Sequence, residues 1–178
     1  MAHQAAAVTH GHPAAHTSSA LMSATLSGLF LGETIRTAYR NARGVVLQDL
    51  SLQDTHTQDY MEQAFELGNC EPRAAVGELG EGWIAEEALA ISLFATMVTK
   101  DFSSAVLRAV NHSGDSDSTG AIAGNLMGAI VGLEGIPNVF LKELEGGELV
   151  ASLAGDLVSE FVSDKDSDWP AGRYPLGG

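Results

Sequence analysis

The chain has 178 residues, which is long enough for one domain with a buried core and too short to predict two large ones. Hydrophobic residues make up 45% of it and charged residues 18%, a balance typical of a compact chain rather than a disordered one. The formal net charge of -14, with 9 Lys and Arg residues in all, argues against a nucleic-acid-binding protein, because phosphate contacts need clustered basic side chains. A metal cation or a neutral, hydrogen-bonding ligand fits this acidity better.

Neither the start of the chain nor its apolar segments indicate export or membrane insertion. The start, MAHQAAAVTH, lacks the basic segment and apolar run of a signal peptide. The longest apolar stretch, AIAGNLMGAIVGL, is shorter than the roughly 20 residues that span a bilayer. The single cysteine, Cys70, allows no internal disulfide and has no activating neighbours in the sequence. We therefore expect a soluble, cytoplasmic protein with no membrane contact.

Apolar residues recur at helical spacing through most of the chain. Asp101 is predicted to cap one helix, and Pro137 to open another in its first turn. The predicted helices cover residues 14–31, 33–42, 55–68, 83–99, 102–110 and 119–133, a segment from Pro137, and residues 148–163. RAAVGEL, residues 73–79, is the only candidate strand. The prediction is an all-α chain with one domain over 1–163 and a polar, Pro/Gly-containing tail over 164–178.

Glycines recur every four residues along the predicted helix 119–133, at positions 120, 124, 128 and 132. Each glycine costs a helix interior roughly 1 kcal/mol relative to alanine. A row of them on one face predicts that the backbone of another element packs very close to this helix. We therefore expect a buried, central helix whose N-terminus faces the segment before it.

That preceding segment is NHSGDSDSTG, residues 111–120, which we call the Asp-rich loop. A calcium-binding EF-hand loop would need a glutamate at its twelfth position, where Leu126 stands. The phosphoryl-transfer pattern Asp-x-Asp-x-Thr also matches, but it should follow a buried strand, and NHSG precedes it here. Both of these interpretations are therefore unfavourable.

Two interpretations of the Asp-rich loop remain open. Asp115 or Asp117 can cap the helix and complement its dipole, for which one carboxylate is enough. Alternatively, both carboxylates and the hydroxyl of Ser118 can converge on one hard cation, since oxygen ligands suit Mg²⁺, Mn²⁺ or Ca²⁺ rather than Zn²⁺. The second acid and the flanking glycines favour the metal site.

Three stretches, in this order, resemble the ADP-ribosylglycohydrolase family, which includes the dinitrogenase-reductase-activating glycohydrolases. They are VTHGHPAAHTSSALMSA (8–24), GEGWIAEEALAISLFA (80–95) and AVNHSGDSDSTGAIAGNLMGAIVGLEGIP (109–137). The resemblance extends to about residue 160. It implies a single compact, orthogonal helical domain that hydrolyses the glycosidic bond between ADP-ribose and a protein side chain or small acceptor, at a centre with two Mg²⁺ or Mn²⁺ ions.

The same resemblance implies roles for individual residues. Asp115, Asp117 and Ser118 would ligate metal, with Ser118 where many members have threonine, and His10 would lie near ADP-ribose. The expected partners are ADP-ribose or an ADP-ribosylated protein. Family members also carry N-terminal Gly-Asp and Thr-Asp-Asp motifs that complete the metal site and supply the catalytic acid. We find neither here, so we expect this chain to correspond to the C-terminal portion of the family fold and assign no catalytic residue.

Other residues of these stretches receive structural interpretations. Trp83 is interpreted as a core anchor, and the pair Glu86–Glu87 as a solvated helix face. His12, His16 and His56 receive no role. The rival functional class is a non-enzymatic, metal-binding or ADP-ribose-binding helical module, or a structural relative of the family.

Overall fold

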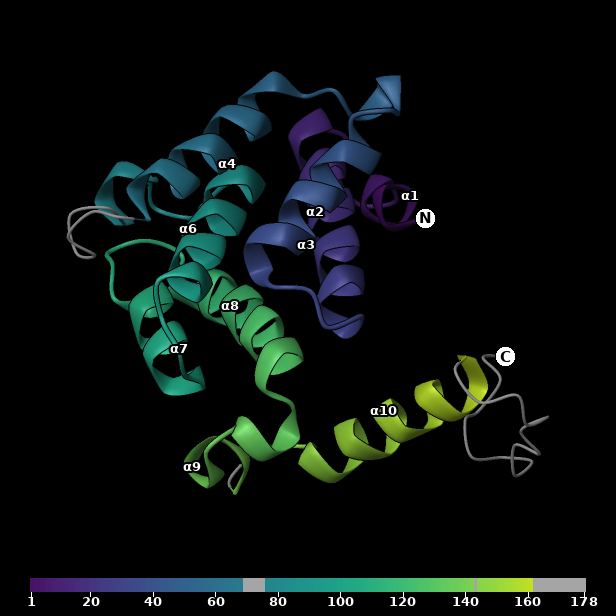
Figure 1. Cartoon of the computed structure of the whole chain (residues 1–178), viewed down its shortest axis with the longest axis vertical. Coiled ribbons are helices and arrows are strands. Elements are labelled where there is room, and N and C mark those ends of the chain that lie inside the picture. The colour runs from purple at the N-terminus through teal and green to yellow at the C-terminus, as the bar shows by residue number, and fades with distance from the viewer. Residues whose placement is uncertain (69–75, 143, 162–178) are drawn as a thin grey trace. The chain divides into compact units, whose positions relative to one another are not determined.

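The computed structural model of the chain describes residues 1–68, 76–142 and 144–161, and these residues form helices and no strand. The chain divides into two compact units, residues 1–137 and 138–178. The helices of the first unit are α1 (Ala2–Ala7), α2 (Pro13–Phe30), α3 (Ile35–Val46), η1 (Leu50–Leu52), α4 (Thr55–Leu67), α6 (Ala85–Met97), α7 (Phe102–Val110), α8 (Ser116–Val131) and η2 (Leu133–Gly135) (Figure 1). The prediction of an all-α fold is confirmed.

Local capping explains where several helices begin. At the start of α2, Nδ1 of His12 accepts a hydrogen bond from the Ala14 amide at 3.3 Å, and Pro13 takes the first helical position. At the start of α7, the carboxylate of Asp101 accepts from the Ser104 amide at 2.9 Å, as predicted. The predicted helix 119–133 begins earlier, at Ser116, because Asp115 serves as its N-cap.

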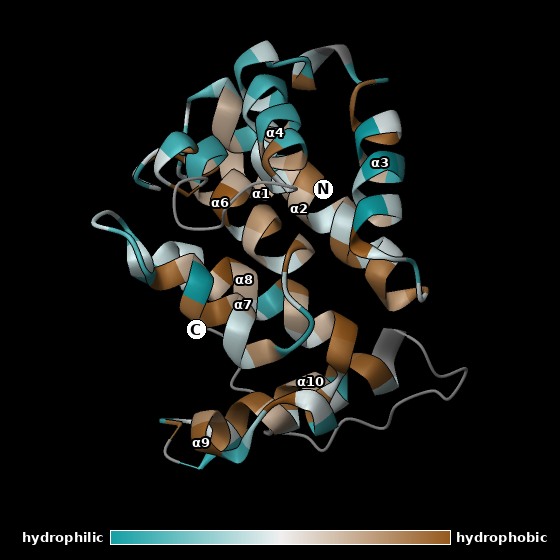
Figure 2. Cartoon of the chain, turned by 60° about the vertical axis from the view of Figure 1, so that its left-hand side comes forward, coloured by the Kyte–Doolittle hydropathy of each residue, from teal (hydrophilic) through white to brown (hydrophobic). Residues whose placement is uncertain are grey.

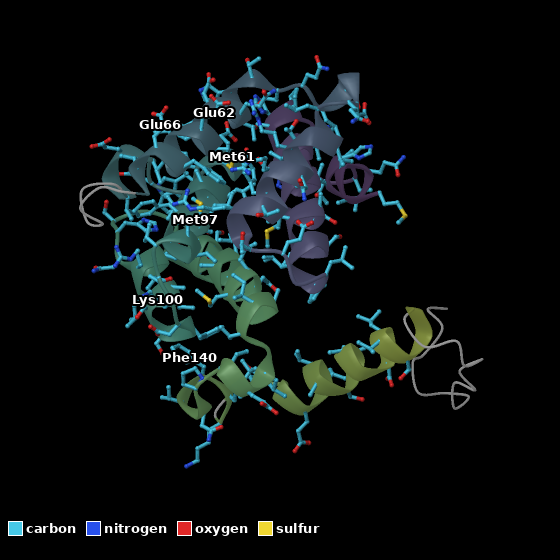
Figure 3. The ribbon with its side chains drawn as sticks, viewed as in Figure 1. Met61, Glu62, Glu66, Met97, Lys100 and Phe140 are labelled. Atoms are coloured by element: carbon cyan, nitrogen blue, oxygen red, sulfur yellow. The ribbon has the colours of Figure 1, made fainter. Side chains whose placement is uncertain are left out.

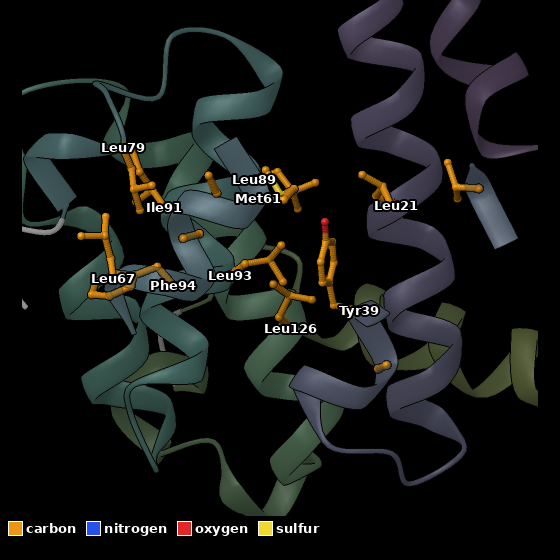
Figure 4. Close-up of a cluster of buried hydrophobic side chains, with 14 of the residues drawn as sticks. Leu21, Tyr39, Met61, Leu67, Leu79, Leu89, Ile91, Leu93, Phe94 and Leu126 are labelled. Carbon is orange, nitrogen blue, oxygen red and sulfur yellow. The ribbon is translucent and has the colours of Figure 1, made fainter. Parts of the chain in front are cut away.

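Helix α6 is the centre of the first unit and packs against α2, α3, α4, α7 and α8. Every residue from 88 to 96 is buried, so the helix has almost no face toward solvent. Figure 4 shows the core that forms around it, with Leu21 of α2, Tyr39 of α3, Met61 of α4 and Leu126 of α8. This arrangement places the N-terminus of α6 among the helices that form the candidate site.

Three of the helices that pack against α6, namely α3, α4 and α7, are amphipathic instead. On α4, Met61 is buried, whereas Glu62 and Glu66 lie on the outer side of the helix (Figure 3). Hydrophilic residues recur along α3 and α4 (Figure 2). A surface ion pair joins these two helices, because Arg43 of α3 lies 2.6 Å from Glu62. Such an exposed pair contributes at most about 1 kcal/mol, so burial of the inner faces holds the helices together.

The glycines of α8 do not mark a close approach of two backbones. A Cβ atom added at Gly124 or Gly128 would lie 3.9 Å from the nearest side-chain atom, which is an ordinary contact. At Gly120 a side chain would be sterically hindered, because an added Cβ would lie 2.6 Å from Cγ1 of Val110. Gly132 ends the helix with a φ of 67°, a conformation that favours glycine. The prediction that another backbone packs close to these glycines is therefore wrong, since the nearest atoms belong to side chains.

The second unit contains α9 (Asn138–Leu141), which begins directly after Pro137, and α10 (Gly147–Phe161). The candidate strand 73–79 lies partly outside the described residues. In its described part, 76–79, residues 76–78 are helical and Leu79 lies in a turn. Cys70 and the tail 164–178 also lie outside them, so the domain boundary at 163 stays a prediction. In the part of the chain that the structure describes, no helix is long and apolar enough to cross a bilayer.

Candidate functional site

A cavity of about 730 Å³ lies in the first unit among α2, α4, α6 and α8. Its apolar lining includes Met22, Leu89 and Ile122. Its polar lining comprises His10, His12, Ser18, Ser19, His56, Glu86, Asp115 and Ser118, together with the indole of Trp83. No Lys or Arg occurs among the described residues that line it, so imidazole N–H groups and helix N-termini are the groups that an anionic ligand could meet there.

Asp115 and Asp117 converge at the start of α8. The amide of Ser118 donates to the carboxylate of Asp115 at 3.4 Å and to that of Asp117 at 3.1 Å. Two carboxylate oxygens that share one donor lie close to each other. The neighbouring carboxyl group of Asp117, followed by the Ser118 hydroxyl, lowers the pKa of Asp115. Asp115 is thus ionised at neutral pH, and the two side chains bring several carboxyl oxygen atoms to one point.

The Asp-rich loop is held from its inner side by His112 and Thr119. Nδ1 of His112 accepts from the Gly114 amide at 3.1 Å, and its Nε2 lies 3.0 Å from the hydroxyl of Thr119. Because Nδ1 accepts, Nε2 carries the proton and donates to Thr119. Thr119 is fully buried and donates its hydroxyl to the Ala109 carbonyl at 2.8 Å. The loop is therefore fixed before any ligand binds.

The structure brings three of the four predicted site residues to the cavity, namely His10, Asp115 and Ser118. Asp117 is exposed and is not among the lining residues. Within the described residues, no group of three or more His, Cys, Asp or Glu side chains is placed to hold a metal ion. Two carboxylates and a hydroxyl suit Mg²⁺ or Mn²⁺, but such an ion seeks about six ligands. The donor set therefore fits part of a metal site.

His10 lies in the segment between α1 and α2, where its side chain is exposed. Its Nδ1 lies 2.8 Å from the hydroxyl of Thr9. Nε2 of His16 donates to the His10 carbonyl at 2.6 Å, which ties this segment to α2. Neither contact uses Nε2 of His10, so this nitrogen is available to a ligand. His10 is neither a core residue nor the helix cap, which is His12.

The interpretation of residues 83–87 from the sequence is wrong in two respects. Trp83 is not a core anchor, because it is 66% exposed and lines the cavity, with Nε1 donating to Glu81 at 3.2 Å. Glu86 is not on a solvated face, because it is 4% exposed and its carboxylate lies 3.2 Å from Nδ1 of His56. The sequence did contain a signal for the burial of Glu86, because α6 is apolar on all sides. A carboxylate in the first turn of such a buried helix is buried together with the helix.

Comparison with known proteins identifies the family to which the chain is similar. The sequence model of the ADP-ribosylglycohydrolase family matches residues 1–167. The ADP-ribosyl-[dinitrogen reductase] glycohydrolase of Rhodospirillum rubrum is 27% identical over 140 residues, which cover 79% of this chain and 41% of that protein. An uncharacterised protein of Archaeoglobus fulgidus is 30% identical over 114 residues, which cover 63% of this chain and 36% of that protein.

The matched region is a limited part of these relatives, because the chain spans about two fifths of the length of the curated proteins it matches. No solved structure matches the chain significantly. The family model covers both His10 and the Asp-rich loop, which are the two stretches that meet at the cavity.

Proposed function

Because this chain belongs to the ADP-ribosylglycohydrolase family, we propose that it carries part of the active site of a metal-dependent hydrolase. The reaction cleaves the glycosidic bond between ADP-ribose and a protein side chain or small acceptor. One observation carries the proposal: His10, from the segment before α2, and Asp115 and Ser118, from the start of α8, line the same cavity although about a hundred positions separate them in sequence.

The Asp-rich loop has the chemistry of a cation site. Asp115, Asp117 and Ser118 would hold Mg²⁺ or Mn²⁺, together with ligands from elsewhere. When bound, such an ion supplies Lewis acidity and orients the oxygen atoms of a sugar. Without a cation, the carboxylates of Asp115 and Asp117 would repel each other, so ion binding would stabilise the start of α8.

The other residues of the cavity would bind and orient the substrate. Nε2 of His10 can donate to or accept from ADP-ribose, and Met22, Leu89 and Ile122 offer an apolar wall for a base. The exposed indole of Trp83 is a surface on which a flat ring can stack. No residue of this chain is assigned as the catalytic acid. A cytoplasmic location stays a prediction from the sequence.

The second candidate function is a metal-binding or ADP-ribose-binding module without turnover. The observation in its favour is that no third carboxylate or imidazole joins Asp115 and Asp117 within the described residues. The two candidates share the binding chemistry and differ in hydrolysis.

The test combines binding and turnover. Calorimetry would measure Mn²⁺ binding to this chain, and ADP-ribose release would be assayed in a protein in which the N-terminal portion of a family member precedes it. Asp115→Asn and Asp117→Asn are expected to abolish metal-dependent release while circular dichroism shows intact helices, because the change removes charge and keeps shape. His10→Ala is expected to weaken ADP-ribose binding without lowering the melting temperature. Full activity in both Asn variants would show that the aspartates of the Asp-rich loop only cap α8 and bind no catalytic metal.

A further inference from the structure

Glu87, in the first turn of α6, holds together the turn formed by residues 80–82. Its Oε2 accepts hydrogen bonds from the amides of Glu81 at 3.1 Å and Gly82 at 3.0 Å. Its Oε1 accepts from the hydroxyl of Tyr60, on α4, at 3.3 Å. Gly80 and Gly82 have φ values of 101° and 79°, which residues with a side chain rarely adopt. A carboxylate that accepts from successive amides is a strong anchor for such a turn.

The turn at residues 80–82, in turn, contacts the Asp-rich loop. The carbonyl of Glu81 accepts a hydrogen bond from the amide of Asp115 at 2.8 Å. The two backbones touch, because a Cβ added at Gly114 would collide with the Glu81 carbonyl oxygen. Asp115 is thus fixed by a turn whose own conformation depends on the carboxylate of Glu87.

We propose that Glu87, assisted by Tyr60, is a positioning residue that sets the orientation of the Asp115 carboxylate for divalent cations. It acts through the backbone of residues 81 and 82. This inference rests on the proposed function in one respect, since it takes Asp115 to be a cation ligand. It extends that function to a pair of residues on α4 and α6 that the Asp-rich loop itself does not include.

The experiment measures Mn²⁺ binding by calorimetry and hydrogen exchange of the Asp115 amide by NMR, both on the full chain. The variants are Glu87→Ala, Glu87→Gln and Tyr60→Phe. Glu78→Gln is the matched control, because Glu78 is exposed and nearby, and its change removes the same charge. Loss of an outer partner of a metal ligand typically weakens affinity by about tenfold or more, and we expect this for Glu87→Ala.

The remaining variants separate hydrogen bonding from charge. Glu87→Gln keeps an oxygen that can accept from both amides, so we expect a smaller loss of affinity than in Glu87→Ala. Tyr60→Phe leaves the charge unchanged, and we expect it to weaken Mn²⁺ binding measurably, whereas Glu78→Gln leaves the dissociation constant at its wild-type value. Exchange of the Asp115 amide is expected to accelerate in Glu87→Ala, while amides in the middle of α6 stay protected. Tyr60→Phe and Glu87→Gln carry the test if Glu87→Ala does not fold.

Two failures are distinguishable. If the wild type binds Mn²⁺ and neither the Glu87 variants nor Tyr60→Phe change the dissociation constant or the exchange of the Asp115 amide, the positioning role is overturned. If the wild type binds no Mn²⁺ under any condition, the metal site of the proposed function is overturned. In that case unchanged exchange at Asp115 overturns the backbone coupling too, and accelerated exchange supports it.

Discussion

Two pairs of acidic residues stand at the starts of two helices, and their surroundings give them different tasks. Asp115 and Asp117, at the start of α8, converge on the amide of Ser118 at the edge of the cavity. Glu86 and Glu87, in the first turn of α6, diverge. Glu86 faces His56, and Glu87 accepts from the turn at residues 81 and 82.

The helix dipole favours acids at both positions, so charge alone does not separate the two pairs. The difference comes from enclosure. Glu86 borders the cavity but is only 4% exposed and faces His56 of α4, and Glu87 is held by Tyr60 of α4 and two backbone amides. Asp117, by contrast, is exposed, and Asp115 is only partly buried. Converging, accessible carboxylates are suited to a cation, and diverging, satisfied ones hold structure in place.

The largest expected effect concerns the contact between the two regions. Gly114→Ala would drive a Cβ into the Glu81 carbonyl oxygen, so we expect the Asp-rich loop to be displaced from the turn. The free energy of unfolding is expected to fall by roughly 3 kcal/mol, as for an overpacked interior. Gly77→Ala is the control, because nothing lies within 4 Å of its added Cβ. Equal urea midpoints for the two variants would mean that the regions are not held in contact.

An intermediate effect is expected at the buried acid. His56→Ala removes the partner of the Glu86 carboxylate, whose side chain is 5% exposed. Leaving a buried acceptor without its donor costs about 1–2 kcal/mol, which urea unfolding would detect. Asp117→Asn, which changes the exposed acid of the other pair, is expected to stay within about 0.5 kcal/mol of the wild type. A comparable loss in both variants would remove the distinction between the two pairs.

The smallest effect concerns Asp101, which shows what a carboxylate does when it is a helix cap alone. Hydrogen bonds from the Ser104 amide and hydroxyl lower the pKa of Asp101. A lowered folded pKa means that its contribution to stability is complete above the unfolded value, about 4, and is lost as the pH falls through the folded value. Asp101→Asn is expected to remove this small acid dependence from urea unfolding curves. Mn²⁺ is expected to leave the contribution of Asp101 to stability unchanged. A metal-dependent change there would contradict the distinction between a carboxylate that only caps a helix and the carboxylates of the Asp-rich loop.

Much of the fold was predictable because its signals are local. Apolar spacing and caps such as Asp101 depend on residues within a turn or two, and the predicted ranges of α2, α4, α6 and α7 closely match the structure. The Asp-rich loop was recognisable for the same reason, since its residues lie within a few positions of one another.

Tertiary structure decided what each side chain of these segments faces. The row of glycines on α8 predicted a neighbouring backbone, yet the spacing could not reveal that side chains of other segments fill that space. Trp83 was expected to be buried and is exposed, whereas Glu86 was expected to be exposed and is buried. Both outcomes depend on how α4 and α8 pack around the start of α6. The sequence by itself determined helices, caps and the chemistry of the Asp-rich loop, for which short-range backbone energetics suffice. Burial and partner choice depend on residues far apart in the chain, such as His56 and Glu86, which meet only when the helices pack.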